Sequence, residues 1–141
     1  MSNQTVFKLE TQIMLRHTDA AGVLFFPRLH EIAHQAVEKL LALIGFPLSD
    51  MISGKLHHLP IVHAEADYNL PCRLGDKLSV EVLLHKLGDH SLGFTCNFLD
   101  SRGEIRAITR VDHAAIDPHT GLVTELNQEL KTALSKLQSK F

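Results

Sequence analysis

The chain has 141 residues and a mass of 15.7 kDa, so its length predicts a single domain over residues 1–141 and leaves no room for a second. Apolar residues make up 45% of it, enough to fill a core without a metal or disulfide staple, which excludes disorder as the main state. The 14 basic and 16 acidic residues give a net charge of −2 with no long run of like charges. Sequence-independent binding to nucleic acid is therefore not expected.

Targeting signals and cysteine spacing indicate the compartment. No apolar run approaches the roughly 18 residues that span a bilayer, and the N-terminus has neither a basic n-region nor an apolar h-region. The two cysteines, Cys72 and Cys96, have the spacing of neither a disulfide framework nor a CxxC pair. We expect an unexported, cytoplasmic protein with reduced thiols and no membrane partner.

The first half of the chain predicts a strand, a loop and a long helix. Apolar and polar residues alternate over about residues 6–15, and a loop follows over residues 17–26. From Pro27 the apolar spacing becomes helical for about 18 residues, and Gly45 is a stop signal. The apolar stripe of this helix comprises Leu29, Ile32, Ala33, Ala36, Val37, Leu40 and Ile44. Phe26 stands where a capping residue is usual but has no side-chain acceptor, so the first N–H groups are left for water or a ligand.

The second half predicts an antiparallel meander and a short helix. Four further segments have the pattern of strands with one core face: 61–68, 77–87, 91–100 and 104–116. Short connections between the later segments favour hairpins. Thr124 could cap a final helix, in which leucines recur at helical spacing from Leu126 to Leu137.

These elements together predict an α+β domain in which one antiparallel sheet covers one long apolar helix. A sheet of this kind leaves an edge strand, and edges are often satisfied by pairing with a second copy of the chain. We therefore expect a homodimer.

The first candidate site lies between the first strand and the long helix. Asp19 stands in a loop of small residues that includes Gly22, a few positions before the uncapped helix start at Phe26. A carboxylate can attack a carbonyl carbon or activate water, and a free N–H at a helix N-terminus can stabilise the oxygen that becomes negative. Acyl transfer needs this pair of groups. The alternative is that Asp19 hydrogen-bonds its own loop.

Two other groups of polar residues have simpler interpretations. His30, Glu31 and His34 satisfy the H-E-x-x-H pattern of zinc peptidases, but the chain lacks the downstream residues of the extended motif. We interpret both histidines as flanking the core stripe and expect no metal. His63 and Glu65 lie on the polar face of the 61–68 segment, which faces solvent, a second subunit or, in the functional alternative, a pocket.

Three segments carry a family resemblance. Residues 16–28, with the sequence RHTDAAGVLFFPR, resemble the hotdog-fold acyl-CoA thioesterases of the 4-hydroxybenzoyl-CoA thioesterase type. The segments LPIVHA at 59–64 and PCRLGDKL at 71–78 continue the resemblance. Within the family they are most similar to the 1,4-dihydroxy-2-naphthoyl-CoA thioesterases of phylloquinone and menaquinone biosynthesis.

The resemblance implies a hotdog fold, in which a five-stranded antiparallel sheet wraps a long central helix, and a C-terminal helix follows. It implies a dimer with the active site between subunits, and commonly a tetramer. Asp19 matches the catalytic aspartate, and the backbone N–H of Phe26 matches the donor that polarises the thioester carbonyl. Gly22, Phe25 and His63 are the implied substrate-binding residues.

The chain departs from its relatives at two places. One short-chain branch of the family has a histidine where this chain has Phe26, so that substrate preference is not expected here. Gly88 to Ser91 lacks the basic residues that relatives place against the nucleotide phosphates. The leading hypothesis is a thioesterase, without cofactor, that hydrolyses 1,4-dihydroxy-2-naphthoyl-CoA. The alternatives are hydrolysis of 4-hydroxybenzoyl-CoA or a broader set of acyl-CoA esters, and a non-catalytic acyl-CoA-binding module.

Overall fold

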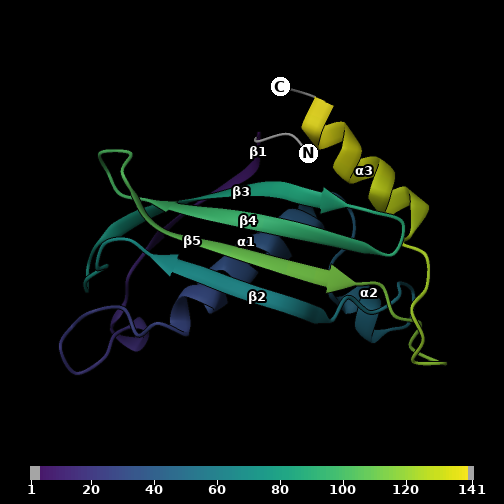
Figure 1. The fold of residues 1–141 in the computed structure, drawn as a ribbon, viewed down its shortest axis with the longest axis horizontal. Coiled ribbons are helices and arrows are strands. Elements are labelled where there is room, and N and C mark those ends of the chain that lie inside the picture. Colours follow the sequence, from purple (N-terminus) through teal and green to yellow (C-terminus); the bar gives the residue numbers. More distant parts are fainter. Residues whose placement is uncertain (1–3, 140–141) are drawn as a thin grey trace.

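The computed structural model describes residues 4–139, so residues 1–3 and 140–141 of the predicted domain lie outside the described residues (Figure 1). The elements in chain order are β1 (Thr5–Gln12), the 3-10 turn η1 (Leu15–His17), α1 (Arg28–Leu43), α2 (Ser49–Ile52), β2 (Ile61–Tyr68), β3 (Lys77–Leu87), β4 (Ser91–Leu99), β5 (Ile105–Ala114) and α3 (Gln128–Ser139). No helix among these residues is long and apolar enough to cross a membrane.

All five strands form one antiparallel sheet in the order β1-β3-β4-β5-β2, which leaves β1 and β2 at its edges. The expected α+β class and five-stranded sheet are confirmed. The expectation of a simple meander from β2 onward is wrong, because β2 pairs with β5 and not with β3. β3 pairs instead with β1, which is distant in sequence, so residues 69–76 carry the chain from one side of the sheet to the other.

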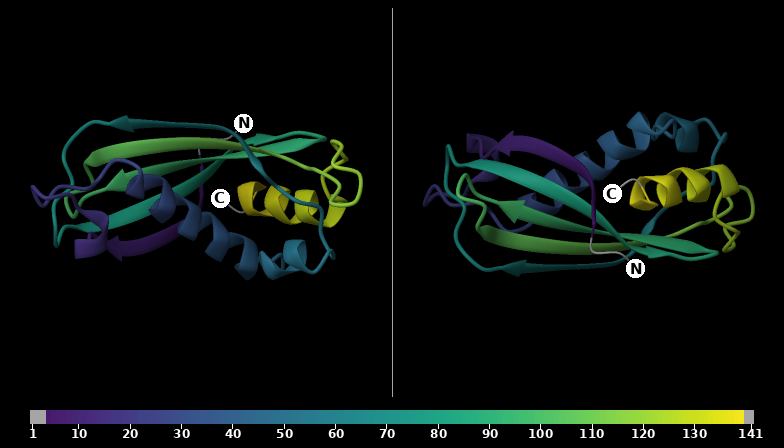
Figure 2. Two further views of the ribbon diagram at one scale, coloured as in Figure 1. Left: turned by 90° about the horizontal axis from the view of Figure 1, so that it is seen from below. Right: turned by 90° about the horizontal axis from the view of Figure 1, so that it is seen from above.

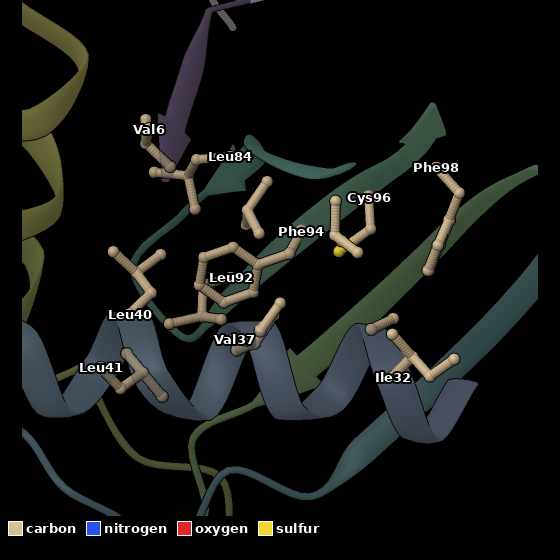
Figure 3. Close-up of a cluster of buried hydrophobic side chains, with 14 of the residues drawn as sticks. Val6, Ile32, Val37, Leu40, Leu41, Leu84, Leu92, Phe94, Cys96 and Phe98 are labelled. Atoms are coloured by element: carbon tan, nitrogen blue, oxygen red, sulfur yellow. The ribbon is translucent and has the colours of Figure 1, made fainter. Parts of the chain in front are cut away.

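α1 and α3 lie on the same side of the sheet (Figure 2). The predicted apolar stripe of α1 is confirmed: Leu29, Ala36 and Leu40 are fully buried, and Ile44 packs partly buried against the same cluster. Figure 3 shows the side chains of α1 pointing at Phe94 and neighbouring residues of the sheet. The apolar face of the helix, with its helical spacing, and the apolar face of the strands, with its alternating spacing, therefore pack together in one core.

Three local expectations differ from the structure. Pro27 is the N-cap residue of α1 rather than its first helical residue, and it supplies no side-chain cap. The short helix α2 has no counterpart in the sequence prediction. Thr124 does not cap α3, since its N–H donates to the Ala115 carbonyl in an extended pairing. The cap is Asn127, whose Oδ1 accepts the N–H of Leu130 at 2.9 Å.

The expected core face of β2 is largely uncovered in the isolated chain. Seven of its eight residues are exposed, and Ala66 alone is half-buried. Ile61 and Val62 are 51% and 63% exposed. An edge strand with uncovered apolar side chains and unpaired backbone groups is suited to pairing with another chain.

A polar bridge crosses β4 on the face of the sheet opposite α1. The ring of His85, from β3, lies 2.7 Å from Asp112 Oδ1 of β5 and 2.8 Å from Thr95 Oγ1 of β4. Gly93 stands beneath this bridge, and a Cβ at that position would overlap both the Asp112 carboxylate and the His85 ring. The glycine therefore leaves the space in which the bridge forms.

Replacing Gly93 by alanine should lower the free energy of unfolding by about 1–3 kcal/mol, because the new methyl group must displace His85 and Asp112. Denaturant unfolding followed by circular dichroism measures the change. Gly88→Ala is the matched control, since the nearest atom to its added Cβ is Ser91 Oγ at an ordinary 3.4 Å. Equal effects at both glycines would contradict the role assigned to the bridge.

Candidate active site

The loop before α1 is held by a ladder of backbone hydrogen bonds. The N–H of Phe25 donates to the His17 carbonyl at 2.8 Å, and the N–H of Asp19 donates to the Val23 carbonyl at 2.9 Å. The N–H of Leu24 donates to the Cys72 carbonyl at 2.7 Å, which joins the loop to the segment after β2. The loop is therefore rigidly attached at the end of the sheet where α1 begins (Figure 1).

The Asp19 carboxylate has one engaged oxygen and one free oxygen. Oδ1 accepts the N–H of Ala21 at 2.8 Å and the N–H of Val23 at 3.3 Å. This is the loop hydrogen bonding that the sequence left as an alternative. Oδ2 makes no hydrogen bond with any residue from 4 to 139, and the side chain is exposed. The same contacts that stabilise the loop thus orient the second carboxylate oxygen.

The N–H of Phe26 has no acceptor among the described residues. Of the two adjacent residues, Phe25 donates its N–H to the His17 carbonyl, and Pro27 has no N–H. Among the described residues no side chain caps α1, and the one acidic residue of its first turn, Glu31, is ion-paired with Arg28. The first N–H groups of the helix are therefore left without a capping acceptor. The sequence prediction of a free donor at Phe26 agrees with this geometry, and its catalytic use stays a prediction.

A cavity of about 340 Å³ lies beside Phe26. Its walls come from the end of the loop, from the last residue of β2 and the segment that follows it, and from β5; the lining residues are Val23, Leu24, Phe26, Tyr68, Asn69, Leu70, Pro71, Cys72 and Ala107. The ring of Phe26 meets that of Tyr68 edge to face at 6.5 Å between centroids. A largely apolar cavity with aromatic walls suits a planar acyl group.

Two smaller cavities, of about 170 and 110 Å³, lie between α1 and the sheet and share His34, Val37, Phe94 and His113. The second is also lined by Ile61 and Ala64 of the edge strand β2. The Nδ1–H of His113 donates to the Leu59 carbonyl at 2.8 Å, which leaves its Nε2 as an acceptor.

The three predicted substrate-binding residues, His63, Phe25 and Gly22, do not line the cavities described above. His63 lies on the face of the sheet opposite α1, 3.3 Å from Glu65 Oε1, and lines none of the cavities described above. Phe25 is 45% exposed, and its ring lies against the Phe26 ring with 5.4 Å between the ring centroids. Gly22 has φ +75° and accepts the N–H of Leu74. Their roles in binding stay predictions.

The H-E-x-x-H residues do not converge on one point. Glu31 is bound to Arg28 at 2.6 Å, whereas His30 and His34 line the cavity against β2. Among residues 4–139 no group of three or more histidine, cysteine or acidic side chains has a geometry that could hold a metal ion.

Tyr68, Asn69 and Leu70 were not singled out from the sequence, and Pro71 and Cys72 were noted as part of the segment 71–78 that carries the family resemblance but not as site residues. They belong to the wall of the largest of these cavities only because β2 ends beside the start of α1. No local pattern marks Tyr68, since its contact with Phe26 joins residues 42 positions apart. The single available signal is that Tyr68 is the one tyrosine of the chain.

Two buried histidines predict how stability depends on pH. Burial lowers the pKa of both His17 and His113 below the ordinary 6.5, and the Arg16 charge adds to the effect at His17. The unfolded chain therefore binds protons more readily than the folded chain as the pH falls below about 6.5. Thermal unfolding should give a lower Tm at pH 5 than at pH 7, with a smaller difference in His113→Gln. The same difference in Tm between pH 5 and pH 7 in the variant would show that His113 does not contribute to the pH dependence.

Known proteins resemble the chain in sequence. Residues 13–134 match the model of the thioesterase-like superfamily. The 1,4-dihydroxy-2-naphthoyl-CoA hydrolase of Rippkaea orientalis is 31% identical over 129 residues, which cover 90% of this chain and 94% of that protein. The hydrolase of the same name from Synechocystis is 31% identical over 134 residues, or 93% of this chain and 96% of that protein.

The fold is also that of a solved thioesterase. The crystal structure of a 1,4-dihydroxy-2-naphthoyl-CoA thioesterase from Synechocystis superposes with a TM-score of 0.87 and 28% identity, over 93% of this chain and 96% of that one. This chain has the five-stranded antiparallel sheet and the long helix α1 of that fold. The chain belongs to the thioesterase-like superfamily, and the resemblance seen in the sequence is confirmed.

Proposed function

We propose that the protein is a thioester hydrolase that acts on an aromatic acyl-CoA, with 1,4-dihydroxy-2-naphthoyl-CoA of quinone biosynthesis as the favoured substrate. The observation that carries the proposal is that one loop holds both an Asp19 carboxylate oxygen and a Phe26 N–H that have no hydrogen-bond partner among residues 4–139. The names of the relatives support the substrate class. Hydrolysis of 4-hydroxybenzoyl-CoA or of broader acyl-CoA esters is the alternative within this class.

The proposed reaction uses both groups on the thioester carbonyl. Asp19 Oδ2 either attacks the carbonyl carbon or takes a proton from the water that attacks it. The carbonyl oxygen becomes negative and accepts the hydrogen bond of the Phe26 N–H. The C–S bond then breaks, CoA leaves as a thiolate that is protonated, and the acid is released. In the covalent alternative, C–S cleavage leaves an anhydride between the acyl group and Asp19, and water hydrolyses it to release the acid. Attack of this water at the Asp19 carboxyl carbon would put solvent oxygen into Asp19 in a single turnover.

The active form in this proposal is a dimer, and by family resemblance a tetramer, with β2 as the pairing edge. Its exposed backbone and the uncovered side chains of Ile61 and Val62 support pairing there. A second copy on β2 would also cover the cavity that Ile61 and Ala64 line. Phe25, Gly22 and His63 are proposed to contact substrate in that assembly.

The whole chain acts in this proposal as one hotdog domain, with the sheet wrapped around α1 as its central helix. It needs no cofactor, since a carboxylate and an N–H suffice for thioester hydrolysis. A cytoplasmic location fits its two free, buried cysteines.

The function is tested by CoA release from a panel of aryl, short-chain and long-chain acyl-CoA thioesters. We expect turnover that favours aryl esters, with 1,4-dihydroxy-2-naphthoyl-CoA the best substrate. Preference for a short or long alkyl chain would overturn the substrate class. Binding of acyl-CoA without CoA release, by protein of native circular dichroism, would favour a non-catalytic binding module instead.

A further inference from the structure

Tyr68 joins the edge of the sheet to the start of α1. It is the last residue of β2, and its hydroxyl donates to the Phe26 carbonyl at 2.6 Å. Its ring also meets the Phe26 ring edge to face, with 89° between the ring planes. The residue whose N–H is free is therefore the one that Tyr68 holds by its carbonyl and by its ring.

The Phe26 carbonyl has little other support. Its second hydrogen bond, from the N–H of Leu29, is 3.4 Å long and correspondingly weak. Pro27 restricts Phe26 to extended conformations but does not determine where its peptide groups point within that region. The hydrogen bond from the Tyr68 hydroxyl is thus the shorter of the two that the Phe26 carbonyl accepts.

We infer that Tyr68 is a positioning residue of the proposed active site, whose hydroxyl fixes the Phe26 carbonyl and thereby aims the N–H of Phe26 at the thioester oxygen. The inference rests on the proposed function. Donors that are aimed before the reaction stabilise a developing negative charge without reorganising during the step. Partial burial raises the pKa of Tyr68, so the hydroxyl stays protonated and able to donate in neutral solution.

The first test compares kcat and KM of Tyr68→Phe with those of the wild type on the best aryl-CoA ester. The variant keeps the ring and loses the hydroxyl. We expect kcat to fall about three- to tenfold, the range for one hydrogen bond, while KM changes less than twofold and Tm stays near the wild-type value. Ser79→Ala is the matched control, because it removes a hydroxyl bond of the same 2.6 Å length, to Glu10. Its kcat should be unchanged.

The second test reads the hydrogen bond itself, in an Asp19→Asn background where the bound ester persists. Infrared spectroscopy of an ester labelled with carbon-13 at the carbonyl should give a lower stretching frequency in the complex than in solution. Adding Tyr68→Phe should return the frequency part of the way to the solution value. An unchanged kcat, or a lower kcat with an unchanged frequency, would overturn the role of Tyr68. A complex with no shift even when Tyr68 is present would instead contradict the Phe26 donor, and with it the proposed mechanism.

Discussion

Asp19→Asn is expected to lower kcat for an aryl-CoA ester by about 10²- to 10⁴-fold, the range for loss of a catalytic base, and more if the carboxylate is a nucleophile. An asparagine side-chain oxygen can still accept the N–H groups of Ala21 and Val23, so the loop keeps its conformation. The second oxygen is replaced by an amide NH2 group, so the negative charge and the basic site are lost. Steady-state kinetics on the acyl-CoA panel measure the effect.

The control for Asp19 is a carboxylate with the same local bonding at a distant place. Asp117 Oδ1 accepts the N–H groups of His119 and Thr120 at 2.7 and 3.1 Å, in the turn after β5. Asp117→Asn should leave kcat within about twofold of the wild type, since no substrate group is expected there. If Asp19→Asn retained more than about a tenth of wild-type turnover while folded, Asp19 would not be the catalytic group.

Leu40→Ala should lower the free energy of unfolding by about 2–5 kcal/mol. Leu40 is fully buried where α1 crosses the sheet, and its removal leaves a cavity that the close-packed neighbours fill only in part (Figure 3). Urea unfolding measures the loss, at several protein concentrations so that any contribution from subunit dissociation is separated.

Leu43→Ala provides the comparison on the same helix. Leu43 lies one turn further along α1 and is 71% exposed, so its truncation should change stability by less than about 1 kcal/mol. Comparing the two variants separates the effect of burial from that of helix propensity, because both replace leucine by alanine in the same helix. Similar losses at the two positions would mean that the buried face of α1 has been assigned wrongly.

The strand and helix periods could be predicted because each is a local property of the sequence. The segments 61–68 and 77–87 match β2 and β3, and the apolar stripe that begins at Leu29 is the buried face of α1. The N–H of Phe26, which finds no acceptor in the described part of the chain, could also be predicted, since the sequence has no capping side chain there and Pro27 follows. Thr124 failed as a cap because extended pairing with Ala115 competes for the same residue.

The sequence by itself determined the five strands, the long helix and the C-terminal helix, the core face of α1 and the position of Asp19 and Phe26 on one loop, because the spacing of residues along the chain is sufficient for each. Only the tertiary structure decided that β2 pairs with β5 and that Tyr68 reaches the Phe26 carbonyl. Both features depend on which strands become neighbours in the sheet, and the order of the strands is determined by the burial of the whole core. No spacing within a single segment encodes it.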